Sequence, residues 1–223
     1  MSDASKIINR SESNNYISGR KIFLLDELTT TSCAELIGNI SNMVDELHWT
    51  TIDTEHISQI TNPYILPQKH DQVIDIYINS GGGWLNTTKS IMTLLNIARA
   101  KGTIIRTTVM GTAASCASLI AIQGTPGFRI MYDQAYNLIH YGRSTYSVDK
   151  IDEIGRVAKY EREMRDSFNA PYLQYTNLTK HDLSKYQRTE FGNIPARECL
   201  EKNICDWILT ADGRFISRDQ HQR

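Results

Sequence analysis

The chain has 223 residues, with 24 basic and 25 acidic side chains and a formal net charge of −1. This length suits a single α/β domain with a large core, and the balanced charge excludes the strongly basic surface that nucleic acid or an anionic membrane would attract. The chain has four cysteines, Cys33, Cys116, Cys199 and Cys205. Because they form no C-x-x-C pair, we expect neither a zinc site nor a disulfide framework. Since the N-terminus lacks an apolar signal segment, we expect a cytoplasmic protein without a membrane partner.

Residues 1–19 are polar and are predicted to form a mobile N-terminal arm. An apolar run at 21–25 then predicts a short buried strand, and apolar residues recur at helical spacing over 33–47 behind a cap at Thr31 and Ser32. From 48 to 72 the sequence is polar and is broken by Pro63 and Pro67, which predicts a long connection. Its histidines match no metal-ligand spacing, so no metal site is expected.

A strand that ends in a glycine-rich turn follows the long connection. Isoleucines alternate along 73–79, three glycines stand at 81–83, and the amphipathic segment 85–100 predicts a helix. Glycine-rich turns before helices can hold phosphate, but this one lacks both the Gly-Lys-Ser/Thr ending and the Gly-x-Gly-x-x-Gly pattern. The sequence therefore does not favour a nucleotide site here.

A turn of small residues at 111–117 separates a β-type run at 104–110 from an apolar helix predicted at 117–123. Ser115 stands within this turn, where a strand changes into a helix. The N-terminus of a helix offers unpaired N–H groups and a positive dipole end, which suit an oxyanion forming beside the serine hydroxyl. A plain helix cap is the alternative that this turn leaves open when it is read alone.

The second half of the chain alternates short strands with helices. A strand at 136–140 ends in His140, which follows Ser115 by 25 residues and is a candidate general base. Helices are predicted at 148–168, 176–183 and 195–202, and a closing strand at 204–209. A single domain is thus expected over 20–210, followed by a polar C-terminal tail over 211–223.

Three blocks, at 79–83, 111–117 and 138–140, stand in the order and spacing found in the ClpP family of serine endopeptidases, peptidase group S14. The chain resembles this family from about Ile22 to Leu209. The resemblance implies a ClpP/crotonase-like α/β fold with repeated β-β-α units, a mostly parallel sheet and a protruding handle helix at 148–168. It implies no cofactor, and the divergent arm and tail resemble those of a phage-encoded relative.

The resemblance also implies roles for individual residues. Ser115 would attack a peptide carbonyl as His140 removes its proton, giving an acyl-enzyme that water hydrolyses. The N–H groups of Gly82 and Cys116 would bind the oxyanion. The residues expected to hold the substrate backbone are Gly83, Trp84, Tyr141 and Gly142.

The third catalytic residue of the family is an aspartate, and no aspartate stands at the matching position here. When this sequence is aligned with the family pattern forward from residue 179, the position of the aspartate falls on Tyr186. When it is aligned backward from residues 205–209, the position falls on Gln187. Asp182 and Glu190 are the carboxylates nearby. A backbone carbonyl, Gln187 or Asp182 could therefore orient His140.

The implied activity is that of an ATP-dependent-type peptidase, in which identical subunits form a ring-shaped chamber that cleaves unfolded polypeptides delivered by an AAA+ unfoldase. The missing aspartate supports an alternative, a non-catalytic structural subunit of such an assembly. A crotonase-type acyl-CoA enzyme has a similar fold, but it is disfavoured because it needs no serine at the strand-to-helix turn.

Overall fold

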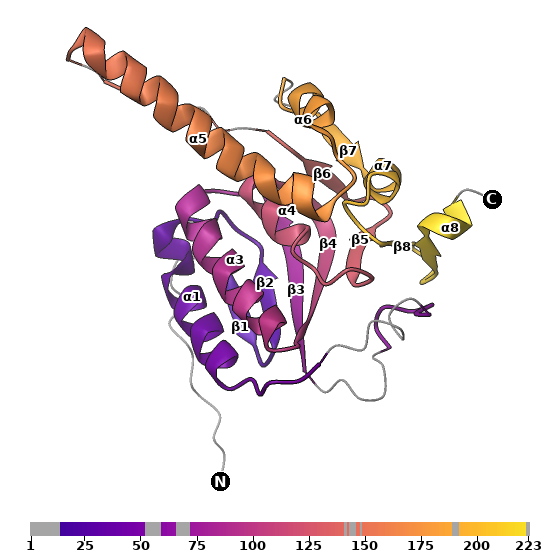
Figure 1. Cartoon of the computed structure of the whole chain (residues 1–223). Coiled ribbons are helices and arrows are strands. Elements are labelled where there is room, and N and C mark those ends of the chain that lie inside the picture. The colour runs from indigo at the N-terminus through magenta and orange to yellow at the C-terminus, as the bar shows by residue number, and fades with distance from the viewer. Residues whose placement is uncertain are drawn as a thin grey trace.

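The structure is a computed structural model, and it describes residues 14–51, 59–65, 72–140, 142, 146–147, 149–188 and 192–221. At its centre lies a mixed, mostly parallel sheet whose main path runs β1-β2-β3-β4-β5-β8-β9 (Figure 1). The strands are β1 Tyr16–Ser18, β2 Lys21–Leu24, β3 Val73–Ser80, β4 Ile104–Ala114, β5 Arg129–Tyr132, β6 Tyr136–Leu138, β7 Asn193–Pro195, β8 Trp207–Leu209 and β9 Phe215–Ser217. This architecture confirms the predicted α/β fold.

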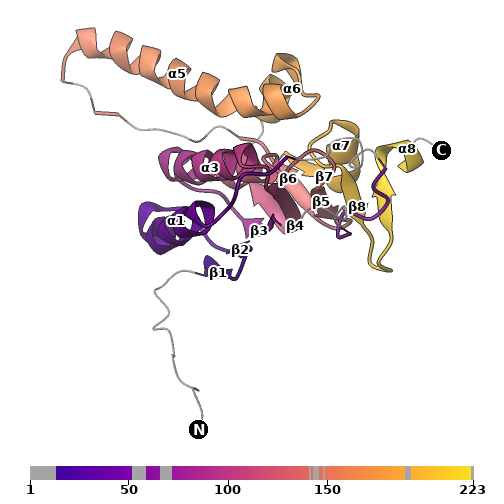
Figure 2. The same cartoon turned by 60° about the horizontal axis from the view of Figure 1, so that its bottom comes forward.

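Seven helices among the described residues accompany the sheet: α1 Thr30–Asp45, α3 Leu85–Ala100, α4 Cys116–Ala121, α5 Ile151–Tyr175, α6 Lys180–Tyr186, α7 Ala196–Glu201 and α8 Arg218–His221. Helices α1 and α3 pack against each other on one face of the sheet, and α5 crosses above α3 as a further layer (Figure 2). Helix α1 is capped by Thr29 rather than by Thr31, because Thr29 and Ser32 exchange hydrogen bonds in a capping box.

Strand β4 is the longest strand and has different partners along its length. Its parallel neighbours β3 and β5 flank Thr107, Thr108 and Val109, whereas its last three residues pair in parallel with β6. The carboxyl ends of β3, β4 and β6 therefore meet at one edge of the sheet. The three blocks singled out in the sequence follow or end these strands.

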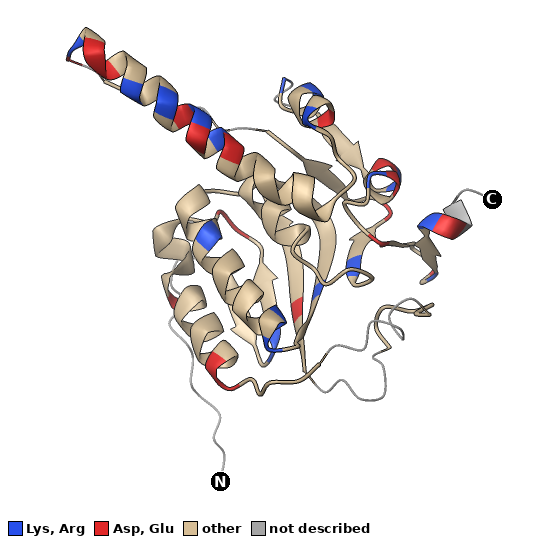
Figure 3. Ribbon diagram, viewed as in Figure 1, with Lys and Arg blue, Asp and Glu red and all other residues tan. Residues whose placement is uncertain are grey.

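Helix α5 continues past its predicted end at residue 168 to Tyr175, although Pro171 lies inside it. Proline in a helix interior removes a hydrogen bond, so the sequence pattern favours a stop before this point. Burial of Phe168 and Tyr172 against the body offsets that loss. The first half of α5 projects from the domain and carries closely spaced charges of both signs (Figure 3).

Two strands lie in the segments expected as arm and tail. Strand β1 pairs antiparallel with β2, and the side-chain carbonyl of Asn15 accepts the N–H groups of Leu25 and Asp26 at 2.9 and 3.0 Å. Strand β9 pairs antiparallel with β8, with Phe215 packed edge-on against Trp207. Such strands of three residues are too short for an alternating pattern to predict them.

A buried ion pair links β5 to the start of β8. Arg129 and Asp206 share a contact of 2.5 Å, and the side chain of Arg129 is only 3% exposed. The same guanidinium donates to the carbonyl of Tyr175 at 2.8 Å and to both oxygens of Asn203 at 2.8 Å. One cation thus joins the sheet to the ends of α5 and α7.

Replacing Arg129 by methionine should destabilise the fold by about 3–5 kcal/mol, because Asp206 would remain largely buried without a counterion. Chemical denaturation monitored by circular dichroism measures this change. The matched control is Arg214→Met, which removes an ion pair with Asp212 whose side chains are 77% and 55% exposed. Equal midpoints for the two variants would contradict the structural role of Arg129.

Candidate active site

Ser115 lies at the junction between β4 and α4. Its φ of 51° is positive and its ψ is −123°, a conformation that costs on the order of 1–3 kcal/mol for a residue with a side chain. The Ser115 N–H donates to the Leu138 carbonyl at 2.8 Å, which holds the junction against β6. Ser115 is the N-cap residue of α4 by position, but its side chain makes no capping hydrogen bond, so a capping role does not account for a serine here.

The glycine turn after β3 presses against this junction. A Cβ added to Gly82 would lie 2.5 Å from the Ala114 carbonyl oxygen and 2.7 Å from the Ser115 Cβ, and the φ of Gly82 is +97°. Both the space and the backbone conformation therefore require glycine. The chain can bring the two turns together because parallel neighbouring strands end at the same edge of a sheet.

Main-chain N–H groups predicted to bind an oxyanion lie around Ser115. Helix α4 begins at Cys116, so the N–H of this residue has no carbonyl one helical turn earlier to bond. The Gly82 N–H donates to the Ser80 hydroxyl at 3.2 Å, a bond that an oxyanion would have to replace. Burial raises the pKa of the Cys116 thiol, and hydrogen bonds that include one from the Gly83 main chain oppose that rise. The Gly83 main chain therefore faces the start of α4.

His140 follows the end of β6 by two residues. The parallel register pairs Ala114 with Leu138, and the bond from Ser115 to Leu138 continues that register beyond β4. The chain from β6 thus runs past the level of Ser115 toward the start of α4. His140 is half-buried on this path. The fold brings the nucleophile and base candidates to the same edge of the sheet.

The remaining substrate-binding candidates lie along the glycine turn and beyond His140. Leu28 donates to the Gly82 carbonyl at 2.7 Å and accepts the Trp84 N–H at 2.9 Å, so one edge of the turn is already paired. Backbone groups alternate in direction along an extended chain, so those of Gly83 face away from Leu28. The Trp84 side chain is 58% exposed. Tyr141 lies outside the described residues.

The two candidates for the third catalytic role differ in their surroundings. The Asp182 carboxylate accepts the Thr179 N–H at 2.9 Å and the Thr179 hydroxyl at 2.6 Å, and it pairs with Lys202 at 3.0 Å. These hydrogen bonds, those from Thr179 being the largest effect, hold the pKa of Asp182 well below its usual range. Asp182 thus secures the start of α6. Glu190 lies outside the described residues.

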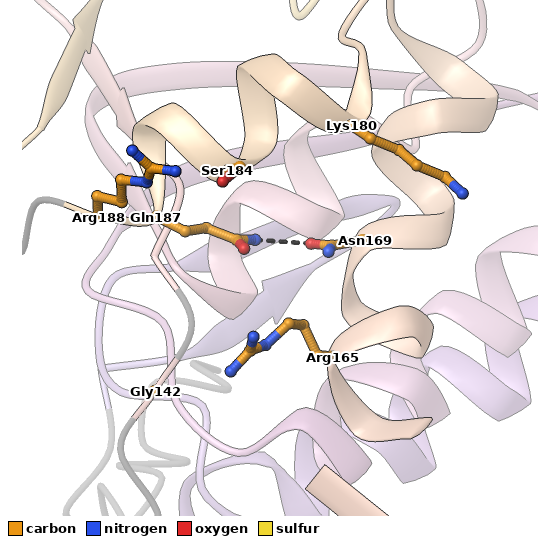
Figure 4. A pocket seen from close by; sticks show the side chains of 7 residues that line it. All are labelled: Gly142, Arg165, Asn169, Lys180, Ser184, Gln187 and Arg188. Atoms are coloured by element: carbon orange, nitrogen blue, oxygen red, sulfur yellow. Dashed lines mark hydrogen bonds between the residues drawn. The ribbon is translucent and has the colours of Figure 1, made fainter. Parts of the chain in front are cut away.

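Gln187 ends α6 beside a cavity of about 480 Å³. Its side-chain amide donates to Asn169 Oδ1 at 2.6 Å (Figure 4). The cavity reaches Gly142, two residues beyond His140, and its other lining residues are Arg165, Lys180, Ser184 and Arg188. Gln187 therefore borders the same cavity as the segment that follows the candidate base, and Asp182 does not line this cavity.

Asn79, for which the sequence pattern predicts no individual role, supports the serine turn. Ile78 pairs with Val109 whereas Ser80 pairs with Ala113, so four positions of β4 span two of β3. The Asn79 side-chain carbonyl accepts the Thr112 N–H at 3.0 Å inside this bulge. Only the strand register reveals the bulge, and no local pattern predicts it.

Within the described ranges, no group of three or more histidine, cysteine or acidic side chains could hold a metal ion. In the same part of the chain, every helix is too short or too polar to cross a bilayer.

Replacing Gly82 by alanine should lower the melting temperature and displace Ser115, because the added Cβ overlaps the Ala114 carbonyl. Thermal unfolding and the rate of reaction with a serine-directed fluorophosphonate measure the two effects. Gly81→Ala is the matched control, since a Cβ at Gly81 meets nothing within 4 Å. If both variants behave alike, the contact between the glycine turn and the serine junction is not as described.

The sequence model of the Clp protease family matches residues 47–212. The chain is 32% identical over 152 residues to an ATP-dependent Clp protease proteolytic subunit of Leuconostoc citreum, covering 67% of this chain and 74% of that protein. It is 31% identical over 167 residues to the subunit of that name from Mesostigma viride, covering 71% and 68%. It is 28% identical over 127 residues to the chloroplastic proteolytic subunit 1 of Arabidopsis thaliana, covering 56% and 63%. With a family match over most of its length and a ClpP-like sheet around the Ser115 turn, this chain belongs to the Clp protease family.

Proposed function

We propose that the chain is a serine endopeptidase of the Clp type in which Ser115 is the nucleophile and His140 the general base. The observation that carries this proposal is the strained positive φ of Ser115 at a strand-to-helix junction, beside the strand that leads to His140. Strain of this kind persists where the surrounding structure imposes it, and it is common at catalytic residues. A residue with only a packing role would not require it.

The proposed reaction has two stages. His140 removes the Ser115 hydroxyl proton as the oxygen attacks a peptide carbonyl, and the imidazolium then gives that proton to the leaving amine. Water, activated by His140, hydrolyses the ester that remains. The oxyanion of each tetrahedral intermediate would accept the Cys116 N–H and a glycine-turn N–H, either that of Gly82 once it leaves Ser80 or that of Gly83 once it leaves the Cys116 thiol.

The substrate backbone would lie along the edge of the glycine turn that faces away from Leu28. Gly83 directs its main-chain groups away from Leu28. Trp84, which is 58% exposed, follows Gly83 in the chain, and we assign Gly142 to the other side of the substrate. Binding through main-chain hydrogen bonds tolerates many side chains, which suits unfolded polypeptides as substrates. Tyr141 would contribute from the segment after His140.

The relatives are named as proteolytic subunits of an ATP-dependent protease. We extend this to the present chain as a proposal that identical subunits assemble into rings served by an AAA+ unfoldase. The projecting half of α5 supports assembly, since Ile151 is 85% exposed and Ile154 is 54% exposed there. Apolar side chains of this size on a projecting helix suit contact with another copy.

Ser115→Ala should abolish labelling by a fluorophosphonate and reduce kcat on an unfolded protein substrate by roughly a million-fold, and His140→Ala should reduce kcat comparably. Ser90→Ala, which changes an exposed serine of α3, is the control and should retain wild-type turnover. The native mass of each sample shows whether it is assembled. A wild-type protein that assembles but neither reacts with the probe nor cleaves would select the non-catalytic subunit instead.

We expect Gln187→Ala to lower kcat and Asp182→Asn to leave it unchanged, because Gln187 borders the segment after His140 and Asp182 is engaged at α6. Asp182→Asn should instead lower the melting temperature near neutral pH. The pKa of Asp182 is depressed in the folded state, so its contribution to stability is present above about pH 4 and is lost as the pH falls.

Steady-state kinetics with Glu190→Gln as a third variant separates the remaining possibility. If Glu190→Gln lowers kcat by orders of magnitude while Gln187→Ala does not, the third role belongs to Glu190. If none of the three variants changes kcat, a backbone carbonyl orients His140.

A further inference from the structure

Three buried polar side chains form a continuous hydrogen-bonded chain beneath the serine turn. The Tyr172 hydroxyl donates to Ser118 Oγ at 2.8 Å, and Ser118 Oγ donates to Asn137 Oδ1 at 2.6 Å. All three residues have a relative exposure of 0%. A hydroxyl can donate only one hydrogen bond. Ser118 therefore donates its hydrogen bond to Asn137 and accepts the one from the Tyr172 hydroxyl.

The two ends of the Ser118–Asn137 bond belong to the elements that carry the proposed catalytic pair. Ser118 lies on α4, three residues after Ser115, and its N–H donates to the Ser115 carbonyl at 3.1 Å. Asn137 lies on β6, three residues before His140, beside Ala113 in the parallel register. This bond therefore fixes the helix behind the nucleophile against the strand that leads to the base.

Tyr172 brings a third element to the same point. It lies in the buried half of α5, where its ring packs on Phe168 with centroids 5.6 Å apart. Helix α5 also contacts α4. Through the Tyr172 hydroxyl, the position of α5 is tied directly to Ser118 on the nucleophile helix.

Fold stability alone does not account for these polar groups. Asn137 Nδ2 is buried and has no hydrogen-bond partner within the described part of the chain. Exchanging the amide oxygen and nitrogen would leave the oxygen unpaired instead. A buried unpaired polar group costs about 1–3 kcal/mol, whereas apolar residues of the same shape in place of both partners can be neutral or stabilising. The hydrogen-bonded chain is retained at a cost, as is typical of a functional constraint.

We propose that Ser118, Asn137 and Tyr172 are positioning residues that set Ser115 relative to His140 and link this pair to α5. Directional hydrogen bonds define a distance between α4 and β6 more narrowly than apolar contacts of similar size do. This inference rests on the proposed function, since the pair it positions is the proposed nucleophile and base. None of the three residues touches the reacting atoms.

The test compares a triple variant, Ser118→Ala with Asn137→Leu and Tyr172→Phe, with the wild-type full chain. Because the triple variant removes all three hydrogen-bonding side chains together, its melting temperature should be equal to or higher than that of the wild type. The rate of Ser115 labelling by a fluorophosphonate, and kcat, should fall by about 10- to 100-fold with little change in KM, because a misplacement of about 1 Å costs this much. Tyr172→Phe alone, which keeps the ring, should lower kcat less and serves if the triple variant fails to fold.

Thr107→Val is the matched control. It removes another buried hydroxyl, that of Thr107 on β4. This hydroxyl donates at 2.8 Å to the carbonyl of Ala121, which lies at the end of α4 far from Ser115. We expect it to lower the melting temperature without changing the labelling rate. A positioning role thus lowers the labelling rate while stability is retained, and a purely structural role does the reverse.

Hydrogen exchange of the Ser115 amide, which bonds to Leu138, provides a readout that does not depend on catalysis. Faster exchange in the triple variant than in the wild type would support the inference even if the wild type neither labels nor cleaves, a result that would overturn only the proposed function. Wild-type exchange in the triple variant, or wild-type labelling in a protein that does react, would overturn the inference.

Discussion

The structure depends on the close approach of two turns that follow neighbouring parallel strands. The backbone at Gly82 lies so near the Ser115 junction that even one added carbon would overlap it. Because β3 and β4 are parallel, both turns leave the sheet at the same edge, and the absence of a side chain lets them share the space there. The strained backbone of Ser115 is tolerated because it is enclosed by this contact and by the bond to Leu138.

Strand β4, which leads to the Ser115 junction, pairs with different strands along its length. Its first part is an ordinary member of the parallel sheet, with uninterrupted pairing to β3 up to Val109. Its last part bulges and turns toward β6, and Asn79 supplies from a side chain the acceptor that the Thr112 N–H loses in the bulge. Beyond the bulge, the end of β4 stays paired with β3 at Ser80 and gains β6 as its neighbour on the other side, and β6 leads to His140.

Two buried polar clusters in this fold differ in how completely their hydrogen bonds are satisfied. The guanidinium of Arg129 meets a carboxylate and several carbonyls, so nearly all of its hydrogen-bonding capacity is used and it joins distant elements. The hydrogen-bonded chain from Tyr172 to Asn137 leaves one amide nitrogen without a partner among the residues that the structure describes, and it lies directly behind the serine turn. The satisfied guanidinium holds the fold together, whereas the incompletely satisfied chain lies behind the proposed nucleophile, where we infer a positioning role for it.

The sequence by itself determined the parallel α/β sheet, the glycine turn, Ser115 at its junction and His140 after β6, because each depends on spacing within one segment and on the rule that parallel strands end at a common edge. The match to the Clp family followed from the same blocks. Only the tertiary structure decided which side chains from distant parts of the chain contact those segments. The engagement of Asp182 by Lys202 depends on side chains 20 residues apart, and the bond from Tyr172 to Ser118 spans 54 residues. The extension of α5 past its proline likewise depends on the surface it packs against. Such contacts are set by how separate elements approach one another in three dimensions, and no periodicity along the chain encodes that approach.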